Sequence, residues 1–178
     1  MINFNNGTEQ LNKFTGSEAK TTFRYENEIY MIKYPDPIRD KHNILSYMNN
    51  QYSEYIGSNI FKSCDFETQE TVLGYLDVNG KVKIVVGCKD FTQNGSTLHE
   101  FSKLTNQTLV EKKPETSIET VNEVISRSNL IENKKEMLNS FWDMFVVDTL
   151  IGNSDRHFDN WGVIERNRVT TQDLTTDN

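Results

Sequence analysis

The residues whose types and spacing could carry out chemistry gather near the end of the chain, in 152-GNSDRHFDNWG-162. Asp155 and Asn160 are separated there by four residues, in a loop that follows an apolar, helix-like run. A carboxylate that orients or deprotonates a hydroxyl, together with an amide oxygen that ligates Mg²⁺, is what phosphoryl transfer requires of a catalytic loop. This spacing is common in proteins, so the rest of the chain has to supply the other groups.

Two further groups that phosphoryl transfer needs lie earlier in the chain. ATP phosphates need a cation, usually a strand lysine held by an acidic residue of a neighbouring helix. Lys33 ends a predicted strand, and Glu54 lies in the helix predicted after it. Before that strand, 14-FTGSEAKTTF-23 contains Gly16 and Ser17, which are small enough for backbone N–H groups to approach phosphates. Each feature alone is typical of ordinary surface residues, and their order along the chain favours a nucleotide site.

The other side chains of the late loop are expected to support it. The His157 imidazole can hydrogen-bond backbone groups and stiffen the loop, since no second histidine lies near it in the sequence. Trp161 is expected to pack into the core, and Asp159 to be solvated. For Arg156, two interpretations stay open: it steers a substrate, or it pairs with a phosphate.

Turn signals and hydrophobic periods predict the elements that position these residues. Aromatic and β-branched residues on both sides of Glu26-Asn27 predict two antiparallel strands over residues 22–34. Residues 51–62 have helical spacing of apolar side chains. In residues 69–91, Asn79-Gly80 between two β-rich runs predicts a hairpin with a type I′ turn.

The second half of the chain is predicted to be mainly helical. Residues 92–115 are polar and are predicted to link two lobes. A short helix is predicted after the capping-box sequence Thr116-Ser117-Ile118-Glu119, and a long one over residues 131–151, ended by Gly152. The sequence therefore predicts an α+β fold in two lobes, an N-terminal lobe over 1–91, a linker over 92–115 and a helical part over 116–178.

Composition excludes several classes of protein. The net charge of -7 and the pI near 5.0 argue against a surface that binds nucleic acid directly. Two cysteines, Cys64 and Cys88, form no zinc motif and are expected to be thiols in a reducing compartment. No signal peptide and no apolar run of about 20 residues is present, so we expect a cytoplasmic protein without a membrane span.

Four segments, in this order along the chain, resemble the HipA-like family of bacterial serine/threonine kinases: 30-YMIKYP-35, 53-SEYIGSNIF-61, 85-VVGCKDF-91 and 152-GNSDRHFDNWG-162. The resemblance runs from about residue 14 to residue 164. It implies a two-lobed fold similar to that of a protein kinase, and ATP-dependent transfer of a phosphoryl group to a serine or threonine of a protein substrate. A toxin–antitoxin partnership is implied in the same way.

The resemblance also implies a role for each matching residue. Lys33 would contact the ATP phosphates with Glu54 as its partner, Asp155 would be the catalytic base, and Asn160 would ligate Mg²⁺. The 88-CKDF-91 stretch resembles the hinge between lobes, where backbone groups of Lys89, Asp90 and Phe91 would meet the adenine. Ser17 is the candidate for an inactivating autophosphorylation, with Thr15 or Thr21 as alternatives.

The end of the chain departs from the family pattern. The second metal-binding carboxylate is expected in a short turn, for which Asp177 is the first candidate and Asp173 the alternative. A large helical lobe is expected to follow, and without it the helix over 131–151 would expose an apolar face. Three hypotheses stay open: a fragment of a kinase, a split kinase completed by another chain, or an inactive nucleotide-binding module that regulates through protein contacts.

Overall fold

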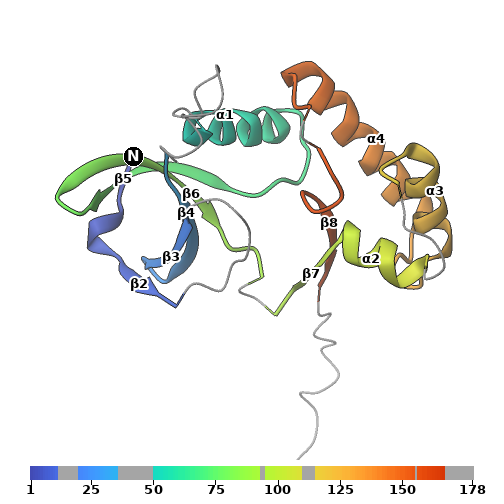
Figure 1. The fold of residues 1–178 in the computed structure, drawn as a ribbon, viewed down its shortest axis with the longest axis horizontal. Helices are drawn as coiled ribbons and strands as arrows, with labels where there is room; N and C mark the ends of the chain where they lie inside the picture. Colours follow the sequence, from blue (N-terminus) through green and yellow to red (C-terminus); the bar gives the residue numbers. More distant parts are fainter. Residues whose placement is uncertain (12–19, 36–49, 93–94, 110–114, 155, 167–178) are drawn as a thin grey trace, which may run out of the picture. The chain divides into compact units, whose positions relative to one another are not determined.

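The structure is a computed structural model that describes residues 1–11, 20–35, 50–92, 95–109, 115–154 and 156–166. The chain divides into two compact units, Met1–Phe91 and Thr92–Asn178, and each unit combines strands with helices (Figure 1). The predicted α+β class is confirmed. Within the ranges just given, no helix is long and apolar enough to cross a membrane.

The first unit is a curled six-stranded sheet with a helix packed on it (Figure 1). The strand order is β1-β5-β6-β4-β3-β2; β1 and β5 are parallel and every other neighbouring pair is antiparallel. Helix α1 lies against β5 and β6. The elements are β1 (Ile2–Asn3), the 3-10 helix η1 (Phe4–Asn6), β2 (Thr8–Gln10), β3 (Lys20–Tyr25), β4 (Glu28–Lys33), α1 (Asn50–Ser63), β5 (Thr71–Val78) and β6 (Lys81–Lys89).

Both predicted hairpins are present, and the Asn79-Gly80 turn has the predicted backbone form. Asn79 and Gly80 have φ values of 56° and 76°, as a type I′ turn between β5 and β6 requires. Glu26 and Asn27, between β3 and β4, also have positive φ values of 46° and 69°. This register makes Lys33 the last residue of β4, paired with Val86 of β6.

The core of the first unit is built around Phe4, which the sequence did not single out. Its side chain is fully buried and packs edge-on against Tyr30, with ring centroids 5.6 Å apart. Gly74 and Gly87 make room for this ring, because an added Cβ would lie 2.5 and 2.6 Å from its atoms. The other buried members of this cluster are Phe23, Ile32, Leu76 and Val85.

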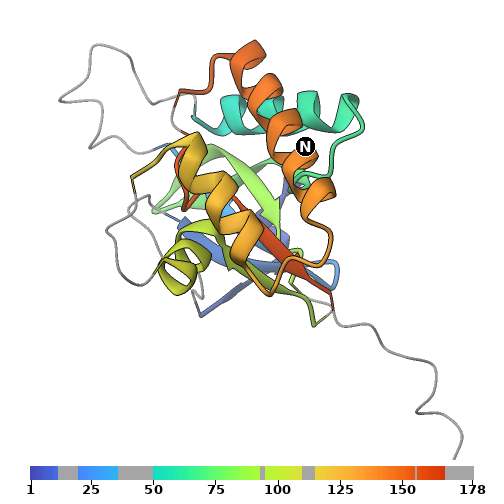
Figure 2. The same cartoon turned by 90° about the vertical axis from the view of Figure 1, so that its right-hand side faces the viewer.

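The second unit joins three helices to a two-stranded antiparallel sheet, and α3 packs against both α2 and α4 (Figure 2). Its elements are β7 (Thr97–Glu100), α2 (Phe101–Thr108), α3 (Ile118–Arg127), α4 (Lys134–Ile151) and β8 (Gly162–Glu165). Residues 92–115, expected as a linker, thus contain β7 and α2. The buried residues of its core are Phe101, Leu104, Val121, Val124, Ile125, Ile131 and Phe141.

Side-chain caps and a glycine set the ends of the two longer helices. The hydroxyl of Ser117 accepts the Thr120 N–H at 3.2 Å, so α3 begins one residue later than the capping box predicted from Thr116 to Glu119. Helix α4 begins after Asn133, whose side chain accepts the Glu136 N–H at 3.1 Å. It ends, as predicted, at Gly152, which has a left-handed φ of 69°. The chain then enters the late polar loop.

Candidate active site

Lys33 and Glu54 are brought together although they lie on different elements. Lys33 ends β4, Glu54 lies in the first half of α1, and Lys33 Nζ is 2.6 Å from Glu54 Oε1. The two side chains are only 24% and 30% exposed. A pair of this kind stabilises a fold little, because partial solvation weakens it. Its geometry is nonetheless what a cation directed at a phosphate group requires, since the carboxylate fixes the position of the ammonium.

Backbone groups of the expected hinge stretch are partly used within the sheet. The Lys89 N–H donates to the Glu70 carbonyl at 2.8 Å, and the Lys89 carbonyl accepts from the Gln69 side chain at 3.2 Å. The Asp90 N–H donates to the Ile29 carbonyl at 2.8 Å. Asp90 is buried, whereas Phe91 is 37% exposed. Of the three residues expected to meet an adenine, Phe91 is therefore the most accessible.

Two groups of the first unit hold their protons more tightly than usual. A hydrogen bond that the Lys89 ammonium donates to Glu28, whose Oε1 is 3.0 Å from Lys89 Nζ, raises the pKa of Lys89 above its ordinary value. Burial raises the pKa of the Tyr30 hydroxyl above its ordinary 10.0. Both groups stay protonated at neutral pH, so Lys89 is held as a cation beside Glu28.

The late loop of the second unit is braced by a buried carboxylate that the sequence did not single out. Asp148, in the last turn of α4, is 4% exposed and receives both Arg156 Nε at 2.6 Å and Arg156 Nη2 at 2.9 Å. The Asn153 side chain donates to the same carboxylate at 2.8 Å. Two-point binding of a guanidinium by a carboxylate is strong and directional. The pair therefore fixes the start of the loop to the end of α4.

Arg156 also reaches the far side of the loop. Its Nη1 donates to the Asn160 carbonyl at 3.1 Å, while the Asn160 N–H donates to the His157 carbonyl at 3.0 Å. His157 Nδ1 accepts from the Asp159 N–H at 3.3 Å, so the imidazole stiffens the loop as predicted. These bonds orient Asn160 by its backbone. Arg156 thus has a positioning role that neither sequence interpretation included.

An aromatic stack anchors the other end of the loop. Trp161 lies over Phe101 with ring centroids 4.0 Å apart and an interplanar angle of 15°. The Trp161 carbonyl also accepts the Phe101 N–H at 2.9 Å, and the Phe158 carbonyl accepts the Ser102 N–H at 3.0 Å. The expectation that Trp161 packs into the core is confirmed. The loop is therefore held at both ends by rigid structure.

One signal for Asp148 was present in the sequence. A carboxylate in the last turn of a helix faces the negative end of the helix dipole, which makes that position unfavourable unless a cation compensates. Arg156 follows eight residues later and is the compensating cation. A residue that breaks a local rule in this way is typical of a functional or structural constraint.

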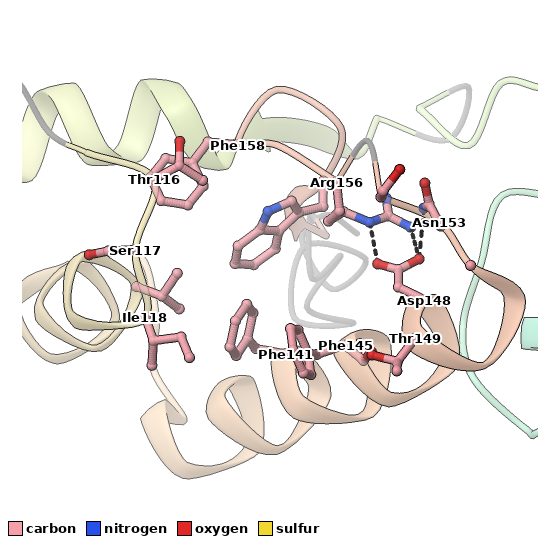
Figure 3. Close-up of a pocket in the computed structure, with 14 residues that line it drawn as sticks. Thr116, Ser117, Ile118, Phe141, Phe145, Asp148, Thr149, Asn153, Arg156 and Phe158 are labelled. Atoms are coloured by element: carbon pink, nitrogen blue, oxygen red, sulfur yellow. Dashed lines mark hydrogen bonds and ion pairs between the residues drawn. The ribbon is translucent and has the colours of Figure 1, made fainter.

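A cavity of about 500 Å³ opens beside this brace (Figure 3). Aromatic side chains, among them Phe141 and Phe145, line one part of it, and the Asp148–Arg156 pair lies at its polar edge. Among the described residues that line the cavity, Arg156 is the one cation, and a carboxylate already binds it at two points. This part of the lining therefore presents no unpaired cation to the phosphates of a nucleotide.

The remaining candidate residues differ in how far the structure describes them. Asn160 is exposed, and an amide oxygen of this kind suits Mg²⁺, which prefers oxygen ligands. In the described part of the chain no group of three or more His, Cys, Asp or Glu is arranged to hold a metal ion. The predicted site residues Gly16, Ser17, Asp155 and Asp177, and the alternatives Thr15 and Asp173, lie outside the described ranges.

Comparisons with known proteins show a kinase relative. No protein-family model matches the chain. The chain is 42% identical, over 147 residues, to the serine/threonine-protein kinase CtkA of Helicobacter pylori. The chain is homologous to CtkA. The match covers 82% of this chain and 43% of the curated CtkA sequence.

The fold comparison gives the same relative. The crystal structure of the Helicobacter pylori proinflammatory kinase CtkA superposes with a TM-score of 0.79 at 40% identity, covering 92% of this chain and 55% of the CtkA chain. The chain thus spans about half the length of this kinase. Its two units have the same fold as the corresponding part of CtkA.

Proposed function

We propose that the protein is an ATP-dependent serine/threonine protein kinase that transfers the γ-phosphoryl group to a hydroxyl of a protein substrate. The observation that carries this proposal is the Lys33–Glu54 ion pair in a chain homologous to a serine/threonine kinase. A strand lysine held by a helix carboxylate is the arrangement that kinases use at the ATP phosphates.

We assign the roles as follows. Lys33 contacts the ATP phosphates, and Glu54 keeps its ammonium in place. Asp155 accepts the proton of the substrate hydroxyl while that oxygen forms its bond to the γ-phosphorus, and the bond from the γ-phosphorus to the bridging oxygen of ADP breaks. Asn160, with Asp177 as the second candidate, would hold Mg²⁺, which neutralises charge on the β and γ phosphates when bound.

The brace on the late loop supports these assignments. Arg156 ties Asp148 to the Asn160 backbone, so the segment from Arg156 to Asn160 is fixed to the end of α4. Catalysis of phosphoryl transfer depends mainly on positioning and on charge neutralisation. Backbone contact with the adenine is assigned chiefly to Phe91, because Lys89 and Asp90 already use N–H groups in the sheet.

Finer assignments rest on the four motifs that resemble the HipA-like family. We propose that the protein belongs to this toxin-type class, with residues 1–91 as the N-lobe and 116–178 as part of a helical C-lobe. Ser17 would be the autophosphorylation site, and an antitoxin would be a partner besides the protein substrate.

A transfer assay tests the proposed function. The wild-type chain and the Asp155→Ala variant are incubated with Mg²⁺ and ATP labelled at the γ-phosphate, and protein-bound label is located by mass spectrometry. We expect label on serine or threonine with the wild type, in this chain or in an added acceptor protein, and at least about 100-fold less with Asp155→Ala. Tight binding of ATP by the wild type with no transfer would contradict kinase activity and favour the nucleotide-binding module.

A further inference from the structure

Helix α1, which carries Glu54, faces the sheet with polar as well as apolar side chains. The residues on its sheet-facing stripe are Gln51, Glu54, Ser58 and Phe61, spaced three and four apart as one face of a helix requires. Gln51 and Phe61 are the buried residues of this helix. The Ser58 hydroxyl is hydrogen-bonded to the Thr71 hydroxyl of β5. The place of Glu54 above the sheet is therefore set by directional polar contacts as well as by the packing of Phe61.

One of these contacts comes from a buried thiol. Cys88, on β6, is 1% exposed, and its Sγ donates to Glu54 Oε2 at 3.6 Å. The other oxygen of the same carboxylate, Oε1, is the one 2.6 Å from Lys33 Nζ. Thr71 of β5 is the cross-strand neighbour of Cys88, so the two links from α1 to the sheet lie side by side.

We propose that Cys88 is a positioning residue for the candidate nucleotide site, which holds Glu54 so that its Oε1 faces Lys33. A carboxylate on a helix surface has several rotamers and can turn toward water. A donor on its second oxygen, fixed in the middle of a sheet, favours the one rotamer in which both oxygens are bound. Because a thiol is a weak hydrogen-bond donor, we expect Cys88 to influence the rotamer of Glu54 while contributing little to the free energy of unfolding.

This role differs from that of a cysteine that only fills space. A space-filling Cys88 would be replaced equally well by any side chain of similar size, because packing depends on volume. A positioning Cys88 requires a donor, so serine would preserve the function and alanine or valine would not. An effect of Cys88 substitution on ATP affinity is expected only if the proposed function holds. An effect of the same substitution on the Lys33–Glu54 pair does not depend on that function.

The test measures the reactivity of Lys33 without nucleotide. Variants Cys88→Ser, Cys88→Ala, Cys88→Val and Glu54→Ala are made in a Cys64→Ala background, which removes the exposed second cysteine. Each is treated with a small acylating reagent, and the rate at Lys33 is followed by peptide mass spectrometry relative to the exposed Lys62 of α1. An ammonium held against a carboxylate is shielded, so loss of the pair speeds acylation.

We expect Lys33 to be acylated about threefold faster in Cys88→Ala and Cys88→Val, as loss of one weak hydrogen bond to a carboxylate predicts, and at nearly the wild-type rate in Cys88→Ser. Glu54→Ala, which removes the ion pair, gives the highest acylation rate expected for Lys33. Equal rates in Cys88→Ala and the wild type would overturn the inference. So would an equal rise in the serine and valine variants, since it would show an effect of shape alone. Valine keeps the buried volume if the alanine variant folds poorly.

A second readout separates this inference from the proposed function. The affinity for Mg²⁺–ATP is measured for the same variants by calorimetry, and we expect the dissociation constant to rise about threefold in the variants without a donor. If the Lys33 rates follow the expected order while the wild type binds no nucleotide, the positioning role stands and the kinase proposal fails. Normal nucleotide binding with unchanged Lys33 rates would overturn the role of Cys88 alone.

Discussion

At the residue scale, the late loop depends on a carboxylate that takes no part in the proposed chemistry. Asp148 is almost fully buried and binds Arg156 at two points, and Arg156 is 27% exposed. If one partner of such a pair is removed, the other is left with an unmatched charge in a poorly solvated place. The brace should therefore be needed both for stability and for the position of Asn160.

The substitution Asp148→Asn tests this brace. We expect it to lower the free energy of unfolding by about 1–3 kcal/mol, since a partly solvated guanidinium loses its counter-charge. The rate of phosphoryl transfer should fall about tenfold to 100-fold, because displacement of a catalytic group by about 1 Å has effects of this size. Denaturant unfolding and the transfer assay measure the two effects.

Asp159→Asn is the matched control for this change. Its carboxylate lies in the same loop but is 66% exposed, with Oδ2 3.4 Å from Nδ1 of the His157 ring. We expect stability within about 0.5 kcal/mol of the wild type, as for other surface substitutions. Equal losses in Asp148→Asn and Asp159→Asn would contradict the brace.

Tyr30 gives a prediction about alkaline pH. Because burial raises its pKa above 10.0, the folded state binds this proton more tightly than the unfolded state does. The resulting stability is present below about pH 10 and is lost as the pH rises through the folded-state pKa. Lys89, whose pKa is also raised, acts with the same sign.

Thermal unfolding of the wild type and Tyr30→Phe between pH 8 and 11 checks this linkage. We expect the wild type to lose stability above about pH 10, and the phenylalanine variant to lose it less steeply, because it has no hydroxyl to ionise. Parallel curves for the two proteins would show that Tyr30 is not part of the alkaline transition.

The sequence predicted which residues belong to the candidate site better than it predicted which residues they contact. Lys33 and Glu54 were found because each stands at the expected place on an element that local signals predict. The roles of Asp148 and Cys88 were not predicted. Each depends on a partner on another segment, Arg156 for Asp148 and Glu54 for Cys88, which lie 8 and 34 residues away in the sequence. No pattern of spacing within one element identifies such pairs.

At the element scale, the core of the first unit depends on the buried ring of Phe4, which packs inside the curled sheet. Phe4 lies in η1, between β1 and β2, and fills the space left by glycines on β5 and β6. A buried aromatic side chain of this size contributes several kcal/mol when the cavity left by its removal cannot collapse. The register of the central strands should be sensitive to it.

Phe4→Ala measures this contribution. We expect the free energy of unfolding of the first unit to fall by about 3–5 kcal/mol, as measured by denaturant titration. Leu11→Ala is the control, because Leu11 is 96% exposed and should change stability by less than about 0.5 kcal/mol. A loss below about 1 kcal/mol for Phe4→Ala would contradict the central place of this ring.

The elements with local signals were predicted, and those that depend on distant pairing were not. The Asn79-Gly80 hairpin and the helix ended by Gly152 follow from turn and cap residues next to them. Strands β1 and β7 pair with β5 and β8, at separations of about 70 residues, and their own sequences are short and polar. Only the tertiary structure selects such strands, since strand preference depends strongly on context.

At the scale of the whole molecule, helix α4 leaves an apolar surface exposed in the second unit. Four large apolar side chains of this helix are at least one third exposed: Trp142 at 38%, Phe145 at 47%, Val146 at 64% and Leu150 at 75%. This is the surface that the sequence predicted for the helix over 131–151. Contiguous apolar surface of this kind favours association and lowers solubility.

Leu150→Glu tests the effect of this surface. We expect less self-association at high concentration, measured by light scattering, and weaker binding of an apolar dye. Asn139→Glu, on an exposed position of the same helix, adds the same charge without removing apolar surface and should change neither. Equal effects of the two substitutions would assign the change to net charge instead.

The central claim is that Lys33, held by Glu54, binds the phosphates of ATP, and calorimetric titration of Mg²⁺–ATP into the wild type and Lys33→Ala tests it most directly. Lys81→Ala, which removes an exposed lysine from the same sheet, is the matched control. The account predicts a dissociation constant at least about tenfold higher for Lys33→Ala, as expected for loss of a charge-assisted contact, and an unchanged one for Lys81→Ala. An unchanged affinity in Lys33→Ala would contradict the assignment of this site.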